Sequence, residues 1–236
     1  MEFPMRINKY LAHTGIASRR EADTLIERGQ ILVNGKKAQM GQAITEHDKV
    51  ELKGETKTRK YLAYYKGRGT ITHSPGEKEV DIVMRLAQDF GIIDVSPVGR
   101  LDKASEGLII LSNDGRIVGP LLNAEGSHEK EYNVQVDKDI STLFVHLMQN
   151  GVDIEGYQTK PTTVVVSSKN EKKFNITLTE GKKHQIRRMC AALGYQVKSL
   201  KRVRIANIEI KNLKPNQYRK IIGEELGTFL QELGVK

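Results

Sequence analysis

Two hydrophobic periods alternate along this chain, and the shorter one predicts strands. In residues 131–136 and 174–178 every second side chain is apolar, which is typical of half-buried strands. The continuous run LIILS at 108–112 predicts a strand buried on both faces. Residues 203–210 alternate again, but the phase slips between Ile205 and Ile208, which predicts a β-bulge. The alternating apolar positions are Tyr132, Val134, Val136, Phe174, Ile176 and Leu178.

The longer period marks an amphipathic helix between these strands. Apolar side chains recur at intervals of three and four residues, and a glycine follows the last of them, as expected at a helix C-terminus. They are Ile186, Met189, Cys190 and Leu193, followed by Gly194. Helices interspersed with mainly alternating strands predict an α+β fold.

Residues 5–52 predict a separate small unit of two helices, a hairpin and a last short strand. Its signals are Ile7 and Leu11 at helical spacing, Ser18 as a cap and Gly29 as a terminator of the second helix, and the turn pair Asn34 and Gly35. The polar segment 53–59 predicts a linker, and 60–236 a second domain.

The distribution of charge along the chain predicts a binding partner. The 236 residues carry a formal net charge of +9, yet residues 172–220 alone hold 14 Lys or Arg against two acidic residues. Such a concentration predicts a polyanion, and nucleic acid fits better than a membrane surface because Pro215 and the strand patterns interrupt any long basic helix. In the N-terminal unit Arg19 and Arg20 begin a helix, while Lys36 and Lys37 follow the hairpin turn; they are either phosphate contacts or ordinary surface charge.

Other function classes receive no support. No apolar run reaches 18 residues and the first residues lack the apolar stretch of a secretory signal, so we expect a cytoplasmic protein with no membrane association. The single cysteine, Cys190, excludes an intrachain disulfide, and the six histidines lack the spacing of a helical metal pair. We expect neither a metal nor a cofactor, and a monomer.

Three residues could carry chemistry, although each has a structural explanation. Asp102 in GRLD could cap a turn, Tyr132 in HEKEY could belong to the core, and Arg187 in HQIRRM could contact a phosphate. A metal-dependent nuclease built on Asp102, Glu106 and Asp114 is disfavoured, since these carboxylates straddle the strand LIILS.

The order of the motifs resembles a known family. RINKYLAHTGIASRREADTLIERGQILVNGKKA resembles an S4-like RNA-binding domain, and GRLDKASEGLIILSNDG, HEKEY and EGKKHQIRRM follow it as in the RsuA/RluB/RluF group of pseudouridine synthases, with most likeness to the RluF branch of that group. The resemblance implies a small S4-like α-L domain followed by a mixed, mainly antiparallel sheet flanked by helices. It further implies a uridine-to-pseudouridine isomerase without cofactor, acting on a 23S rRNA stem-loop and on the tyrosine tRNA anticodon loop, with 16S rRNA or a non-catalytic ribosome-assembly role as alternatives.

The same resemblance implies roles for individual residues. Asp102 would be the essential nucleophile or base, with the Arg187 guanidinium beside its carboxylate, and Tyr132 would stack on the uracil and assist proton transfer from C5. Leu200 would form an apolar wall, and Arg100 would hold the space that the base vacates. The RNA contacts implied are Arg19, Arg20, Lys36, Lys37, Lys183 and Arg188. One departure stands out: the usual Asn-Lys-Pro-x-Gly turn is here a Lys66-Gly67 turn without proline, which affects the expected substrate more than the chemistry.

Overall fold

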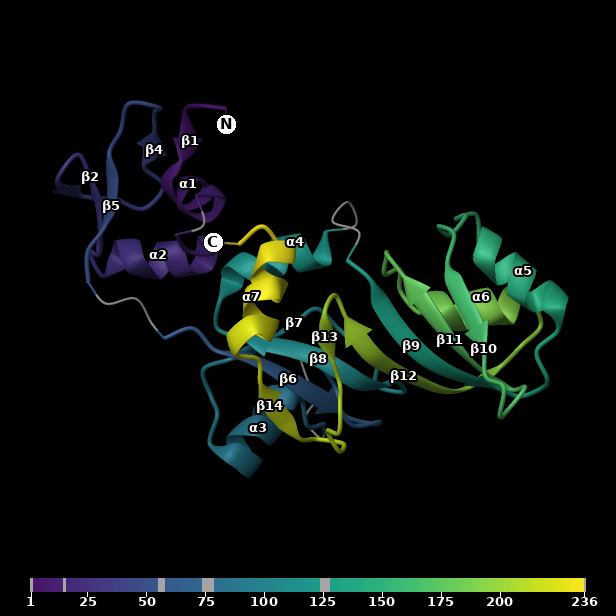
Figure 1. The fold of residues 1–236 in the computed structure, drawn as a ribbon. Coiled ribbons are helices and arrows are strands. Elements are labelled where there is room, and N and C mark those ends of the chain that lie inside the picture. The colour runs from purple at the N-terminus through teal and green to yellow at the C-terminus, as the bar shows by residue number, and fades with distance from the viewer. Residues whose placement is uncertain (1, 15, 55–57, 74–78, 124–127, 236) are drawn as a thin grey trace.

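The computed structural model describes residues 1–236 except 1, 15, 55–57, 74–78, 124–127 and 236. Its N-terminal unit contains two helices and two small sheets (Figure 1). In chain order the elements are β1 (Met5–Arg6), α1 (Ile7–His13), α2 (Arg19–Glu27), β2 (Ile31–Val33), β3 (Lys36–Lys37), β4 (Ala43–Ile44) and β5 (Val50–Leu52). Strand β1 pairs with β4, and the other three form the order β3-β2-β5.

Local sequence signals explain this unit. The Ser18 hydroxyl accepts a hydrogen bond from the Glu21 N–H while the Glu21 carboxylate accepts one from the Ser18 N–H, a capping box that starts α2. Asn34 and Gly35 both have positive φ, 51° and 78°, so a two-residue turn joins β2 to β3. Ile7 and Leu11 of α1 are fully buried in one core with α2. The two predicted helices and the hairpin are therefore confirmed.

The second part of the chain is built on one nine-stranded sheet. Its main path runs β10-β11-β9-β12-β8-β6-β14, with β13 added to β12 and β7 to β8. Every pairing is antiparallel except that of β12 with β8. The strands are β6 (Tyr61–Lys66), β7 (Ser96–Val98), β8 (Glu106–Ser112), β9 (Lys130–Val136), β10 (Thr163–Val166), β11 (Lys173–Leu178), β12 (Val197–Ile205), β13 (Ile208–Glu209) and β14 (Tyr218–Lys220). The predicted mixed, mainly antiparallel α+β architecture is confirmed.

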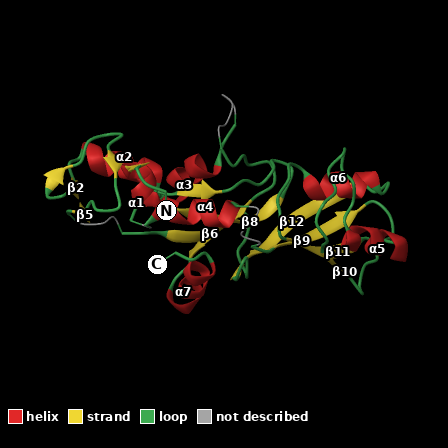
Figure 2. Cartoon of the chain, turned by 90° about the horizontal axis from the view of Figure 1, so that it is seen from above, coloured by secondary structure: helices red, strands yellow, loops and turns green. Residues whose placement is uncertain are grey.

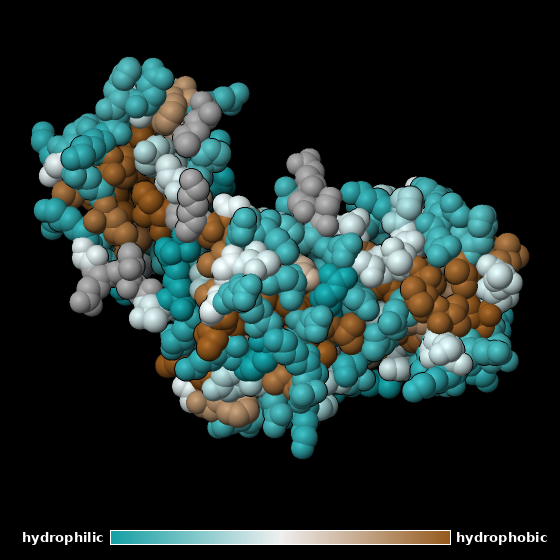
Figure 3. Space-filling view, viewed as in Figure 1, coloured by the Kyte–Doolittle hydropathy of each residue, from teal (hydrophilic) through white to brown (hydrophobic). Residues whose placement is uncertain are grey.

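Helices cover both faces of this sheet. Side chains at odd positions of β6 pack with η1 (Gly115–Ile117), α4 (Val118–Leu122) and α7 (Gly223–Glu232), whereas even positions pack with α3 (Ile82–Phe90). Figure 2 shows α3 and α7 on opposite sides of β6. At the other end, α5 (Thr142–Asn150) and α6 (Gln185–Ala192) share one core with β9, β10 and β11. Apolar side chains gather over this end on the face shown in Figure 3.

One sequence prediction was wrong. The phase slip between Ile205 and Ile208 is a two-residue hairpin turn: the two residues pair with each other, and Ala206 between them has φ +50°. The irregularities of β12 lie earlier, between Val197 and Ser199 and between Arg202 and Arg204. A tight turn and a bulge both shift the period-2 phase, so the pattern alone could not separate them.

Candidate active site

The loop between β7 and β8 carries Asp102, and neighbouring backbone fixes it in place. The Thr72 hydroxyl accepts a hydrogen bond from the Leu101 N–H (3.1 Å) and donates one to the Leu101 carbonyl (2.8 Å). The Gly69 N–H donates to the Lys103 carbonyl at 2.8 Å. Because both neighbours of Asp102 are held by the segment after β6, the backbone beneath its carboxylate has little freedom.

The glycine that follows in the same motif allows β8 to approach β12. Gly107 has φ +112°, and a Cβ atom there would lie 2.2 Å from the Arg202 carbonyl oxygen. The close approach lets the Arg202 guanidinium, only 5% exposed, donate to the Leu108 carbonyl at 2.7 Å. The parallel pairing of Arg202 with Gly107 thus gives the glycine of the EG pair a packing role.

The Asp102 carboxylate is 38% exposed and faces a histidine. Its Oδ1 lies 3.4 Å from Nε2 of His184, the residue that immediately precedes α6. Asp102 and His184 are 82 positions apart in sequence, and the sheet order brings them together because β12, which follows α6, lies directly beside β8. This contact was not expected from the sequence.

A buried lysine interacts electrostatically with the Asp102 carboxylate. Lys66, at the end of β6, is fully buried, and its Nζ donates to the carbonyls of Thr70 (2.7 Å) and Gly67 (3.1 Å). Burial lowers the pKa of Lys66 to about 8, although the carboxylates of Asp102 and Glu106 oppose that shift. The Lys66-Gly67 turn therefore places a buried lysine with a lowered pKa within electrostatic reach of the Asp102 carboxylate.

Arg187 contacts the loop of Asp102 and not its carboxylate. Its guanidinium donates to the carbonyls of Ala104 and Val197, each at 3.3 Å, and to the Ser105 hydroxyl at 3.4 Å. Among the residues that the structure describes, no hydrogen bond or ion pair joins Arg187 to Asp102. Arg187 instead joins α6 to the loop that carries Asp102.

Tyr132 and Leu200 lie together in an apolar cluster with Leu101, the residue before Asp102. Tyr132 is 9% exposed on β9 and Leu200 6% exposed on β12. Arg100 is exposed, and its carbonyl accepts a hydrogen bond from Arg202 at 3.5 Å. The predicted catalytic and wall residues are therefore brought to one region of the sheet.

The predicted RNA contacts differ in availability. Arg19, Arg20, Lys36, Lys37 and Lys183 are all exposed. Arg188 is already engaged, since its Nη2 donates to the Ile154 carbonyl and to the Glu155 carboxylate, each at 2.8 Å. The first five can reach a phosphate directly, whereas Arg188 would first have to leave these partners.

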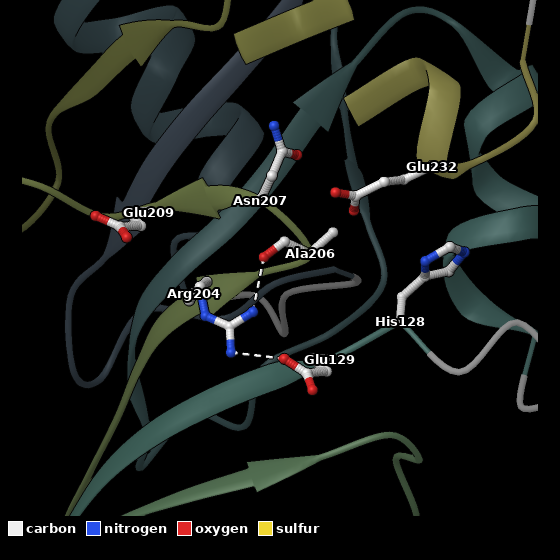
Figure 4. A pocket seen from close by; sticks show the side chains of 7 residues that line it. All are labelled: His128, Glu129, Arg204, Ala206, Asn207, Glu209 and Glu232. Carbon is white, nitrogen blue, oxygen red and sulfur yellow. Dashed lines mark hydrogen bonds and ion pairs between the residues drawn. The ribbon is translucent and has the colours of Figure 1, made fainter. Parts of the chain in front are cut away.

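A hollow of about 390 Å³ lies elsewhere, between the start of β9, the β12–β13 hairpin and the end of α7 (Figure 4). The Arg204 guanidinium points into it and is bonded to the Ala206 carbonyl and to Glu129, while His128 and Glu232 approach from the other side. None of the predicted catalytic residues lines it, so we do not assign the chemistry there. Within the described parts of the chain, no three His, Cys, Asp or Glu residues are placed to hold a metal ion.

Comparison with known proteins decides the family. The sequence model described as RNA pseudouridylate synthase matches residues 60–192, more than half of the chain, and that of the S4 domain matches residues 5–50. The chain belongs to the RNA pseudouridylate synthase family. It is thus an enzyme of RNA modification, with an S4 domain at its N-terminus.

Named relatives agree with this assignment. The dual-specificity RNA pseudouridine synthase RluF of Escherichia coli (strain K12) is 40% identical over 233 residues, which cover 94% of this chain and 77% of that protein. Ribosomal large subunit pseudouridine synthase B of Bacillus subtilis (strain 168) is 31% identical, with 94% and 93% covered. A crystal structure of a pseudouridylate synthase matches with a TM-score of 0.70 at 22% identity, covering 97% of this chain and 99% of that one, and shows the same fold.

Proposed function

We propose that this pseudouridine synthase isomerises a specific uridine of 23S rRNA, with Asp102 as the catalytic residue. The observation that carries the proposal is the rigid loop that presents a half-exposed carboxylate beside the apolar cluster of Leu101, Tyr132 and Leu200. A fixed carboxylate next to an apolar surface suits a base that has left its stack and needs to be held without water.

The reaction balances without an external electron acceptor. The N1–C1′ bond of the uridine breaks, the uracil turns, and C5 bonds to C1′; the C5 proton then leaves while N1 takes one up. An ionised Asp102 either attacks the nucleoside or removes a proton from its sugar, and both routes need the carboxylate oriented towards the ribose. The hydrogen bonds at Leu101 and Lys103 hold the backbone beneath the carboxylate in place before the substrate arrives.

The neighbouring residues act around this carboxylate. Tyr132 stacks against the uracil and assists removal of the C5 proton, while Leu200 excludes water from the detached base. Arg187 holds the loop through Ala104 and Ser105, and Arg100 occupies the space from which the base has turned out.

The RNA crosses both parts of the chain. We assign 5–52 to the S4 domain, 53–59 to a linker and 60–236 to the catalytic domain. Arg19, Arg20, Lys36 and Lys37 bind phosphates of a folded RNA, and Lys183 binds the strand entering the active site, joined by Arg188 if it exchanges Glu155 for a phosphate.

Large-subunit rRNA is favoured because a relative that aligns over nearly its whole length is named for the large ribosomal subunit. The tyrosine tRNA anticodon loop is the second substrate we propose, supported by the 40% identity to a relative named for dual specificity. A chain acting on these RNAs works as a cytoplasmic monomer. No helix in the described residues is long and apolar enough to cross a membrane.

The test is to map pseudouridine in three RNAs. Unmodified 23S rRNA, 16S rRNA and tyrosine tRNA are each incubated with the wild type and with Asp102→Asn, and pseudouridines are located by carbodiimide labelling and reverse-transcription stops. A single new stop in 23S rRNA, with or without one in the tRNA, and none with the variant, supports the proposal. A stop only in 16S rRNA overturns the substrate, and tight binding without any stop favours a role in ribosome assembly.

A further inference from the structure

His184 stands closer to Asp102 than the arginine that the family resemblance places there. Its Nε2 lies 3.4 Å from Oδ1 of Asp102, whereas Arg187 is bonded to the backbone and hydroxyl of the same loop. The sequence HQIR thus places two different groups on the catalytic loop. The arginine holds its backbone, and the histidine faces its carboxylate.

The backbone of His184 is held in an unusual conformation. It has φ +54° and ψ +26°, in the left-handed region, which residues other than glycine adopt uncommonly, although histidine, asparagine and aspartate do so several times more often than the rest. The residue is also the N-cap of α6, yet its side chain makes no hydrogen bond to the first turn of that helix. The side chain faces Asp102 instead, so this backbone conformation directs it to a contact outside the helix.

The contact between His184 and Asp102 is partly exposed to solvent, so bound RNA would strengthen it. The side chains of His184 and Asp102 are 48% and 38% exposed, so bound RNA would cover both and remove the water that weakens their attraction. Hydrogen bonds between catalytic groups are often long in a free enzyme and shorten in the complex with substrate. A movement of a few tenths of an ångström would bring 3.4 Å within the range of a charge-assisted hydrogen bond.

We propose that His184 is a positioning residue that holds the Asp102 carboxylate in its reactive orientation through the Nε2–H group. The inference rests on the proposed function, because it assigns His184 a role only if Asp102 reacts. It differs from a helix-capping role, since capping would need only the left-handed backbone.

Two substitutions distinguish a role of the His184 side chain from a role of its backbone conformation. His184→Asn keeps a residue that tolerates positive φ, but its amide ends at the position of Nδ1 and falls short of Asp102. His184→Gln places an amide N–H at the position of Nε2, on a backbone that suits the conformation less well. The single-turnover rate constant of pseudouridine formation is measured for each, together with the dissociation constant for the same RNA and the melting temperature.

We expect His184→Asn to slow the chemical step roughly 10-fold to 100-fold, which is the range of a lost hydrogen bond to a charged group. His184→Gln should keep the rate within about fivefold of the wild type, and the RNA affinity of both variants should equal that of the wild type. The opposite order, Asn as fast as the wild type and Gln slower, would mean that only the backbone matters and would overturn the inference. Absence of pseudouridine with the wild type itself would instead refute the proposed function.

Discussion

Gly115 contacts Ser18 of the S4 domain, and the substitution Gly115→Ala tests whether this contact between the two domains matters for RNA binding. Gly115 begins η1, directly after the turn that ends β8. A Cβ atom at Gly115 would lie 2.3 Å from Cβ of Ser18 and 2.5 Å from its Oγ, more than 1 Å short, for the carbon, of the 3.4 Å at which ordinary contact begins. Rotation of the Ser18 side chain does not relieve this contact, because it moves Oγ and leaves Cβ in place. The hydroxyl also accepts the capping hydrogen bond of α2 from the Glu21 N–H at 3.2 Å.

Gly115→Ala must therefore move the start of α2 away from η1, which also strains or breaks the cap. Loss of the cap costs about 1 kcal/mol of stability. Movement of α2 displaces Arg19 and Arg20, which follow Ser18 on the exposed side of the helix. We expect RNA binding to weaken roughly 5-fold to 20-fold, which corresponds to about 1–2 kcal/mol, while the chemical step at saturating RNA stays within about twofold of the wild type.

The assay is filter binding of a 23S rRNA fragment, with single-turnover kinetics at saturating enzyme. Gly119→Ala, in the adjoining helix α4, is the matched control, because an added Cβ there meets nothing within 4 Å. Wild-type affinity and melting temperature in Gly115→Ala, or an equal loss of affinity in the control, would show that the two domains do not bear on each other at this contact.

Two further predictions concern stability and charge. Burial of Asp114 opposes ionisation, but hydrogen bonds from Arg116 and Tyr61 outweigh it and lower the pKa of Asp114, so its carboxylate stabilises the fold above the unfolded pKa, and this contribution is lost as the pH falls through the folded pKa. Asp114→Asn should destabilise the protein by about 3–5 kcal/mol at pH 7, with a smaller difference at pH 3, in urea titrations; an equal difference at both pH values would contradict this. Changing Arg19 and Arg20 together to Ala should reduce the magnitude of the negative slope of log affinity against log salt by about 2, and an unchanged slope would show that α2 does not contact the RNA.

Local periodicity was enough to predict much of this fold. Tyr132, Val134 and Val136 are buried on β9 as their alternation predicts, and Ile186 and Met189 are buried on α6 as their helical spacing predicts. These patterns depend on neighbours in sequence, since each element needs one apolar face towards the core.

The site was only partly predictable, because its contacts join residues that are distant in sequence. Asp102 could be singled out because its motif is contiguous, but the residues that hold it come from distant segments. Thr72 bonds Leu101 across 29 positions, and His184 meets Asp102 only because β12 lies beside β8. Burial of Lys66 likewise depends on the loop folded over the end of β6. Such contacts leave no period in the sequence.

The most direct test of the central claim measures chemistry and binding on the same RNA. The substrate, labelled with tritium at C5 of uridine, is mixed with excess wild-type enzyme or with Asp102→Asn, and tritium release to water is followed in a single turnover while binding is measured in parallel. The account predicts release of one tritium per modified site with the wild type, none with the variant, and dissociation constants that agree within about twofold. Release by the variant at the wild-type rate, or loss of binding together with loss of release, would contradict a catalytic role for Asp102.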